Sequence, residues 1–238
     1  MANIVKLDSR AHHDLRIKGG PSASHGDAQR FAAVIPGEFT QMATVCPLFF
    51  SKDAETGAFY CGAMLGFDEG ENLFLDGDHY HGRRPLSLQR APFFTAGDDV
   101  ALDLDNPRVG APGGAALFDA DGKPTAYLEG VINSLRLLHA GEQQSRAFIA
   151  TLLQHELIEP LDLDVAFDDG DHHHIRGLYT IDRERLEGLA DEVVVELFRR
   201  GYLLLIHAMI VSQKQLPALV ERRNARKLRA GAGLSFQA

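Results

Sequence analysis

Short apolar runs separated by turn residues fill the first half of the chain. Their length and their content of Val, Ile, Leu and Phe are typical of buried strands. The predicted strands lie at residues 32–35, 45–50, 59–67, 72–75, 93–94 and 100–104. Asp53 to Gly57 predicts a turn, and Asp121-Gly122 predicts a hairpin because Asp-Gly supports positive φ at low cost.

The apolar period lengthens in the second half. Leu and Val recur at helical spacing from Leu128 to Leu138 and predict an amphipathic helix that ends before Gly141. A second helix is predicted over residues 142–157, stopped before Pro160.

Strand and helix signals then alternate. Residues 161–165 alternate with period two, and a turn at 168–171 is predicted to return the chain as a second strand over 175–181. Asp182 is a suitable N-cap for the next helix, because its carboxylate can accept orphan backbone amides. Further helices are predicted over 193–200 and 217–227, whereas 202–211 is apolar all round and fits a buried strand or a buried helix.

This pattern predicts an α+β fold. The β-rich N-terminal half carries short antiparallel strands and hairpins, and the mixed helical C-terminal half is expected to share one core with it. Residues 1–30 are polar and rich in Gly and Ser, which predicts a flexible N-terminal arm. Residues 31–229 are predicted to form the single α+β domain, and the small, Gly-rich residues 230–238 a disordered tail.

Composition, the apolar runs and the cysteines together predict where in the cell the protein is located. Apolar residues make up 45% of the 238 residues, enough for a folded core. The longest apolar run, 202–211, is too short to cross a bilayer, and the polar N-terminus does not resemble a signal peptide. Cys46 and Cys61 lack a CxxC partner, which fits a reducing compartment. A cytoplasmic location is expected.

Charge is distributed unevenly. The net charge is −9, yet the chain from Arg199 onward holds eight bases and one acid, a net of +7. An acidic body repels phosphate backbones, so nucleic acid is not an expected partner. The basic end could bind an anionic partner, although a solvated helix end is the favoured interpretation.

Several sequence motifs occur in an order that resembles the SapC-like family. They are GFDEGENLFL (66–75), QRAPFF (89–94), LDLDNPRV (102–109), LFDADGKPTAY (117–127), GLYTID (177–182) and LLIHAMIVSQKQLPALVERRN (204–224). The resemblance covers residues 32–225. His172-His173-His174 departs from the pattern, because ordinary hairpin-tip residues are expected there.

The resemblance implies a bacterial protein unrelated to the peptide-transporter permease of similar name. The family takes its name from a gene linked to surface-layer loci. Its members are often encoded beside flavin-dependent tryptophan-halogenase-like proteins, cupin or JmjC-like oxygenases, and TonB-dependent receptors. That context implies a supporting role in handling or modifying a peptide or small nutrient, with such a tailoring enzyme as partner. The family supplies no catalytic residues to carry over.

Metal binding is the sharpest enzymatic hypothesis, since histidine with carboxylate suits iron or zinc. His79 and His81 form an HxH as in a cupin motif, but the glutamate expected a few residues later is absent. His172 and His174 would share one face of a hairpin. For each pair a solvated turn or surface histidine is favoured, because ligand spacing alone is not specific. No cofactor is therefore predicted, with iron or zinc as the alternative.

Other catalytic chemistries lack their residues. The chain has no GxSxG nucleophile elbow and no GxxxxGK[ST] phosphate loop. Neither Cys46 nor Cys61 lies in a basic setting that would lower its pKa. Catalytic residues thus remain unknown.

Polar residues next to or within apolar runs are the better ligand-binding candidates. They are Asn72, Arg90, Tyr179 and His207, of which Tyr179 lies in the GLYTID motif. Buried polar groups must be hydrogen-bonded or charge-paired, so internal satisfaction is the favoured interpretation. Arg90 would pair with a structural carboxylate such as Asp103, or else anchor a peptide or amino-acid carboxylate in bidentate geometry.

Three functional hypotheses remain. The leading one is a non-catalytic binding or accessory protein that assists an oxidative tailoring enzyme acting on a peptide or tryptophan-like substrate. The alternatives are a metal-dependent oxygenase or cupin-type enzyme, and a surface-layer-associated structural protein, against which the missing export signal argues. Neither the ligand nor the oligomeric state follows from the sequence.

Overall fold

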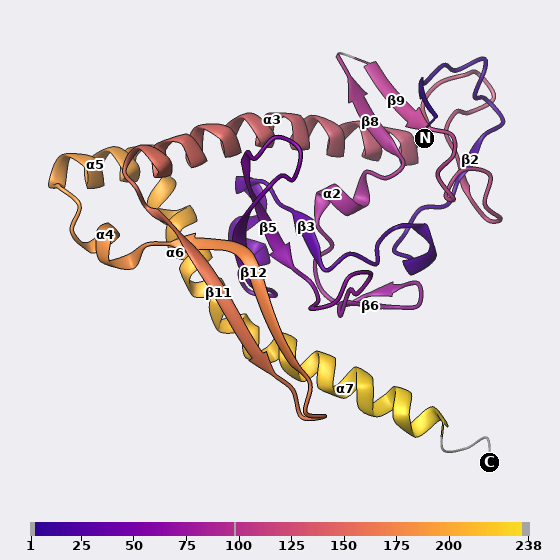
Figure 1. Ribbon diagram of the computed structural model, residues 1–238. Helices are drawn as coiled ribbons and strands as arrows, with labels where there is room; N and C mark the ends of the chain where they lie inside the picture. The colour runs from indigo at the N-terminus through magenta and orange to yellow at the C-terminus, as the bar shows by residue number, and fades with distance from the viewer. Residues whose placement is uncertain (1–2, 98, 235–238) are drawn as a thin grey trace. The chain divides into compact units, whose positions relative to one another are not determined.

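The computed structural model describes residues 3–97 and 99–234 and confirms an α+β fold (Figure 1). The chain divides into two compact units. In the described residues, unit 1 holds 3–28 and Leu75–Glu142, and unit 2 holds Gln29–Phe74 and 143–234. The expectation of one domain over residues 31–229 did not anticipate this division.

Unit 1 is built on short antiparallel strands. Its elements are β1 (Ile4–Lys6), β2 (Arg16–Ile17), η1 (Ala23–His25), β6 (Leu75–Asp76), β7 (His79–Tyr80), α2 (Leu86–Gln89), β8 (Phe93–Ala96), β9 (Asp99–Asp103), β10 (Ala115–Ala116) and the first part of α3 (Ala126–Gln154). The strands pair in the orders β1-β9-β8, β10-β2 and β6-β7. A common core buries Ile17 of β2, Phe93 of β8, Leu102 of β9 and Leu135 of α3.

The predicted flexible arm over residues 1–30 is wrong for the described residues 3–28. β1 pairs with β9 in the register Ile4↔Asp103, and β2 pairs with β10. Ile17 is completely buried. The arm was predicted from polar and glycine content, but pairing partners about 100 residues away give its backbone amides and carbonyls their hydrogen bonds.

The turn at Asp121-Gly122 is confirmed, and the segments beside it pair antiparallel over a short stretch without forming two regular strands. Asp119 accepts hydrogen bonds from the amides of Asp121 (3.0 Å) and Lys123 (2.9 Å), and Gly122 has a φ of 77°. On either side of the turn the amide of Asp119 donates to the carbonyl of Lys123 (2.9 Å), the amide of Thr125 donates to the carbonyl of Leu117 (3.0 Å), and an antiparallel bridge joins Phe118 to Pro124. The preceding strand, β10, pairs with β2 instead.

Unit 2 combines one larger sheet with helices. Its elements are β3 (Phe31–Ala33), η2 (Pro36–Glu38), α1 (Phe39–Met42), β4 (Leu48–Lys52), β5 (Phe59–Met64), the end of α3, β11 (Ile158–Ala166), β12 (His172–Ile181), α4 (Arg183–Glu187), α5 (Asp191–Arg199), α6 (Tyr202–Ser212), η3 (Gln213–Gln215) and α7 (Leu216–Leu234). The antiparallel sheet has the order β11-β12-β4-β5-β3. The rings of Phe39 and Phe50 pack against Phe148 of α3 in its core.

Both turns predicted in unit 2 are confirmed. Asp53 accepts hydrogen bonds from the amide and hydroxyl of Thr56, and Gly57 follows with a φ of 68° between β4 and β5. The β11–β12 hairpin turns at Gly170, whose φ is 86°. Asp182 caps α4, as predicted, because its carboxylate accepts a hydrogen bond from the amide of Arg185 at 2.9 Å.

The two helices expected on either side of Gly141 are one helix, α3, drawn without a break in Figure 1. Gly141 is buried, as are Leu138 before it and Phe148 after it, at the spacing of a single helix face. A glycine inside a helix costs only about 1 kcal/mol, and burial of apolar side chains on the same face outweighs that cost.

The apolar run whose form was left open, 202–211, is the helix α6, and η3 and α7 extend it. By length and composition, Tyr202–Gly231 could cross a membrane, although core helices of soluble proteins meet the same criterion. The helix is therefore longer than the apolar run 202–211, whose length alone predicts no membrane span. In the predicted disordered tail, residues 230–234 are helical, and residues 235–238 lie outside the described residues.

Candidate functional site

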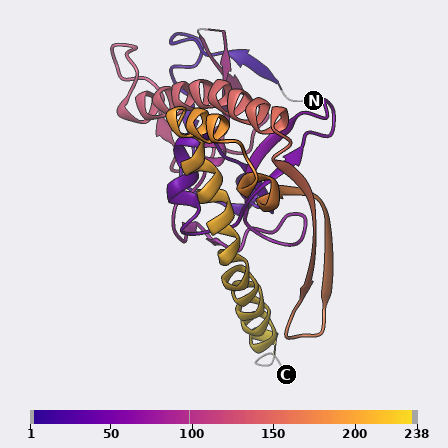
Figure 2. The same cartoon turned by 90° about the vertical axis from the view of Figure 1, so that its left-hand side faces the viewer.

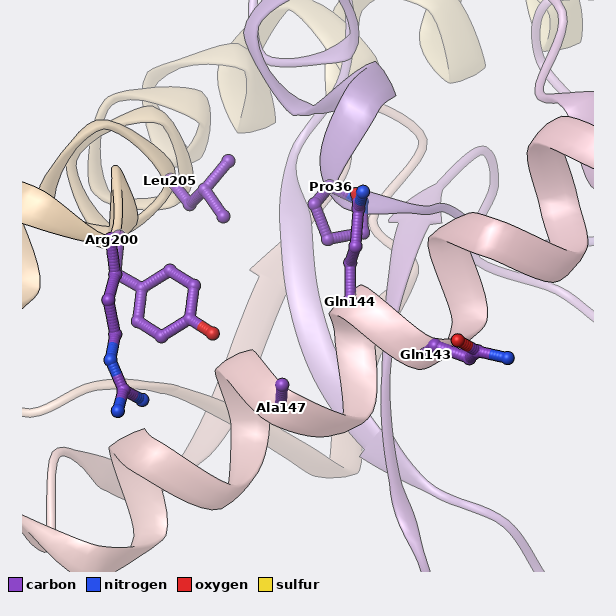
Figure 3. Close-up of a pocket in the computed structure, with 7 residues that line it drawn as sticks. Pro36, Gln143, Gln144, Ala147, Arg200 and Leu205 are labelled. Carbon is purple, nitrogen blue, oxygen red and sulfur yellow. The ribbon is translucent and has the colours of Figure 1, made fainter.

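A pocket of about 530 Å³ opens in unit 2 beside α3 and α6 (Figure 3). We call it the α3–α6 pocket; it is lined by Pro36, Gln143, Gln144, Ala147, Arg200, Tyr202 and Leu205. In Figure 3, Gln144 projects from α3 toward Pro36, and Arg200 and Leu205 lie on the side of α5 and α6. The size suits a small ligand or part of a peptide.

A tight reversal between α5 and α6 places two of the lining residues. Gly201 has a φ of 74°, a left-handed conformation that residues with a side chain rarely adopt. Its amide donates to the carbonyl of Phe198 at 2.9 Å and closes α5, and α6 begins at the next residue. Arg200 and Tyr202 therefore flank the turn and both reach the pocket.

Arg200 is oriented by neutral and charged partners. Its guanidinium donates to the Thr151 hydroxyl at 3.1 Å and pairs with Glu196 at 3.1 Å. The side chain is 51% exposed, so it can also meet a ligand. A guanidinium carries five N–H donors in a planar fork, which suits a carboxylate or a peptide carbonyl.

Tyr202 adds an aromatic surface. Its ring packs edge-on against Phe148 at 5.2 Å between centroids, and Phe148 is completely buried. Arg200 lies 5.9 Å from the centre of the same ring. An aromatic ring held by a rigid neighbour is a suitable surface for a flat, apolar ligand group.

The polar groups of the α3–α6 pocket belong to Arg200, Tyr202, Gln143 and Gln144. The described residues that line it include no His, Cys, Asp or Glu. The amides of Gln143 and Gln144 can each donate and accept hydrogen bonds, as a peptide backbone requires. The arrangement can bind a carboxylate, an amide and an aromatic group together.

A second pocket of about 390 Å³, the hairpin pocket, lies beside β12 and is highly charged. It is lined by Arg30, Phe67, Asp68, Glu69, His173, His174, Ile175 and Arg176. His173 lies 3.6 Å from Asp68, and His174 pairs with Asp164. Arg30 lies 3.5 Å from the carbonyl of Phe67. The His173–Asp68 contact lies within the lining, whereas Asp164, the partner of His174, lies outside it.

Arg90, predicted to pair with a carboxylate, contacts neighbouring residues of unit 1 instead. Its guanidinium donates to the carbonyl of Phe93 at 2.9 Å and stacks over the ring of Phe94 at 4.6 Å. Burial lowers the pKa of Arg90, and the charge of Glu142 opposes that shift. Asp103, its suggested partner, instead accepts from the amide of Asn3 at 3.0 Å.

The other three predicted ligand residues lie in unit 2, and none lines either pocket described above. Asn72 is 2% exposed, and its side-chain oxygen accepts a hydrogen bond from the amide of Phe74 at 3.1 Å. This hydrogen bond is a structural role. Tyr179 packs edge-on against Phe59 at 4.8 Å. His207 is exposed on α6.

The histidines proposed as metal ligands form no complete site in the described residues. The rings of His79 and His81 approach to 4.7 Å, so this pair does come together. His172 is exposed, and His174 pairs with Asp164. Among residues 3–97 and 99–234, no group of three or more His, Cys, Asp or Glu side chains could hold a metal ion.

The two cysteines are unsuited to nucleophilic chemistry, as predicted. Both are buried. Burial raises the pKa of Cys46 to about 12, and Glu38 adds to the rise. The pKa of Cys61 is raised well above its ordinary value by the same cause.

Sequence reasoning missed the pocket residues Arg200, Tyr202 and Gln144. Arg200 and Tyr202 flank Gly201, and a glycine that ends one helix and begins another was a usable signal. The sequence gives no comparable signal for Gln144, because its position in the pocket depends on α3 continuing without a break past Gly141.

Sequence reasoning also missed a buried charge cluster in unit 1. Asp27 is 1% exposed and accepts from Arg108 at 2.9 Å and from Arg84 at 2.8 Å. Arg108 also donates to the carbonyls of Lys18 (3.0 Å) and Gly20 (2.8 Å). The cluster fastens the N-terminal segment, which polar composition alone does not predict.

Comparison with known protein families gives one match. Residues 7–219, most of the chain, match the family described as SapC. No curated protein and no solved structure matches the chain.

Proposed function

Because the chain belongs to the SapC family, we propose that it is a non-catalytic binding protein that assists an oxidative tailoring enzyme acting on a peptide or tryptophan-like substrate. The α3–α6 pocket is the proposed binding site. The single observation that supports this is the combination of Arg200, Tyr202 and two glutamines around one cavity whose described lining holds no His, Cys, Asp or Glu.

Each group in the pocket has a role in this proposal. Arg200 pairs with the ligand carboxylate, and Glu196 and Thr151 hold the guanidinium in place. The ring of Tyr202 carries the aromatic side chain of the ligand. Gln144 bonds the ligand amide, so that a peptide and not merely an aromatic acid is selected.

A titration of N-acetyl-glycyl-tryptophan tests the site. Wild-type protein is expected to bind the free acid more tightly than its C-terminal amide, because only the acid pairs with Arg200. Arg200→Gln should weaken binding of the acid roughly tenfold or more and leave binding of the amide nearly unchanged. Isothermal titration calorimetry measures both.

Arg199→Gln is the matched control, because Arg199 is exposed, adjacent in the chain, and absent from the pocket lining. Its binding should equal that of the wild type. Equal affinity of wild type and Arg200→Gln for the acid, or no binding of either ligand at millimolar concentration, would contradict the proposed site.

The partner is tested separately. Co-expression with a flavin-dependent halogenase-like or a cupin/JmjC-like enzyme encoded beside the gene should yield a complex that survives affinity purification and gel filtration. Repeated failure with each neighbouring enzyme would reject the accessory role while leaving the ligand site standing.

A further inference from the structure

The helices α5 and α6 carry large apolar side chains that unit 2 leaves exposed. We call them the apolar ridge; they are Val194 (36% exposed), Val195 (45%), Phe198 (72%), Leu204 (62%) and Val211 (55%). Phe198 and Leu204 lie three residues to either side of Gly201, where the chain reverses. Exposed large apolar side chains on two consecutive helices mark an interaction surface rather than an ordinary solvent-facing helix.

The exposure of α6 is not that of a core helix. Of the part of Tyr202–Gly231 that is apolar enough to cross a membrane, only 22% is buried within the protein, whereas a core helix is mostly buried. Leu203, Leu205 and Ile210, on further sides of α6, are only half-buried. A partner helix covers one stripe of another helix, whereas the interface of a bilayer covers a wide sector of two helices at once.

The inner side of the same helical run is attached to unit 2. Ile206 and Met209 are buried, and the hydroxyl of the completely buried Ser212 accepts a hydrogen bond from the amide of Leu48 at 2.8 Å. Arg223 of α7 pairs with two carboxylates of the β11–β12 hairpin, and Figures 1 and 2 both show α7 beside that hairpin. A helix held in this way can lie on a bilayer, but it cannot cross one without breaking these contacts.

Basic residues continue the exposed face of the ridge along α7. Val211 follows Leu204 by seven residues and Arg222 follows Val211 by eleven, which are about two and about three helical turns. The exposed charged side chains of α6 and of the described part of α7 are Lys214, Arg222, Lys227 and Arg229, which are basic, and Glu221, which is acidic. The exposed face is therefore apolar at its start and mainly basic at its end.

This charge determines which partner fits the surface. The chain from Arg199 onward has a net charge of +7. A second copy would bring the same positive charge against it, whereas an anionic lipid surface attracts it. Asp191 and Glu192 lie in the first turn of α5, at the end opposite to Gly201, and Glu196 pairs with Arg200 at 3.1 Å.

We propose that the apolar ridge and the basic residues of α7 form a peripheral docking surface for an anionic lipid bilayer. The ridge enters the boundary between headgroups and acyl chains, and Lys214, Arg222 and Lys227 contact lipid phosphates. The helices lie on the membrane and do not cross it. This surface is distinct from the proposed ligand site, because the described lining of the α3–α6 pocket contains no residue of the ridge.

Vesicle sedimentation tests the role of charge. Full-length protein should pellet with vesicles of equimolar phosphatidylglycerol and phosphatidylcholine and stay in solution with phosphatidylcholine alone. Lys214→Gln/Lys227→Gln should weaken binding to the anionic vesicles roughly tenfold or more, because two charges that attract lipid phosphates are lost. Lys123→Gln, at a 75% exposed lysine of unit 1, is the matched control and should bind like the wild type.

A fluorescence measurement tests insertion of the ridge. The chain contains no tryptophan, so a single introduced one reports alone. The emission of Leu204→Trp should shift to shorter wavelength when anionic vesicles are added, because the indole enters an apolar medium. Leu137→Trp, at a 50% exposed leucine of α3 outside the ridge, should show no shift. Leu204→Gln/Val211→Gln should weaken vesicle binding roughly tenfold or more.

Circular dichroism verifies that each variant is folded. No binding to anionic vesicles at millimolar lipid, or binding without a shift in Leu204→Trp, would overturn the proposal. A lipid-free dimer that Leu204→Gln/Val211→Gln converts to a monomer would assign the ridge to a second copy instead. Binding of the wild type to polyglutamate but not to vesicles would assign the surface to an acidic polypeptide.

Discussion

Arg108 of unit 1 and Arg200 of unit 2 are both held by a carboxylate, yet their surroundings differ completely. Arg108 is 1% exposed, and its guanidinium pairs with Asp27 and donates hydrogen bonds to two backbone carbonyls of the N-terminal segment. Arg200 is half-exposed, has one hydroxyl and one carboxylate as partners, and borders a pocket. Burial and the type of partner, not the residue type, therefore distinguish a structural arginine from one that can bind a ligand.

The largest effect is expected from the carboxylate of the buried cluster. Asp27→Asn leaves Arg108 and Arg84 without their shared counter-charge in a site closed to water. We expect a loss of roughly 3–5 kcal/mol in the free energy of unfolding, as for other broken buried ion pairs. Urea denaturation measures it. Asp105→Asn, at an exposed acid of the same unit, should be nearly neutral and serves as the control.

A smaller loss is expected at Arg223, although it is equally buried. Here the partners Asp169 and Asp171 are 39% and 56% exposed, so removal of the arginine leaves two carboxylates that water can reach rather than a buried charge. Arg223→Met should cost about 1.5–3 kcal/mol. A loss larger than that of Asp27→Asn would show that the cost in free energy of unfolding does not depend on how deeply the remaining, unpaired partner is buried.

Arg200→Gln should hardly change stability. Its pair with Glu196 is half-exposed, and such pairs contribute about 0–1 kcal/mol. Thermal unfolding and ligand titration on the same preparation separate the two roles. Strong destabilisation together with unchanged ligand binding would make Arg200 structural, like Arg108.

The smallest effect is a pH dependence at the N-terminal segment. Bonds to the Asp14 carboxylate and to the carbonyl of Asp119, 2.9 Å away, raise the pKa of His13 above 6.5. The contribution of His13 to stability is therefore complete below pH 6.5 and is lost as the pH rises through the higher folded-state value. A proton NMR titration should show the raised pKa in the wild type and a value nearer 6.5 in Asp14→Asn. Identical titration of the two would reject this cause.

The β11–β12 hairpin was predictable because strict alternation, a glycine turn and the Asp182 cap all act locally. The continuity of α3 was not, since the burial of Gly141 and Phe148 on one face depends on distant elements. The structure of the N-terminal segment was not predictable for the same reason, because Asp27 pairs with Arg108, which lies 81 residues away in the chain. Pocket residues such as Gln144 depend on those long-range contacts and were therefore out of reach.

Photo-crosslinking shows directly whether the α3–α6 pocket is the ligand site. N-acetyl-glycyl-tryptophan carrying a diazirine on its indole ring is bound to the full chain, irradiated, and located by peptide mass spectrometry. Labels are expected on α3 and α6 near Ala147, Tyr202 and Leu205, and they should be lost in Arg200→Gln and retained in Arg199→Gln. Labels concentrated at the hairpin pocket near His173, or labels unaffected by Arg200→Gln, would contradict it.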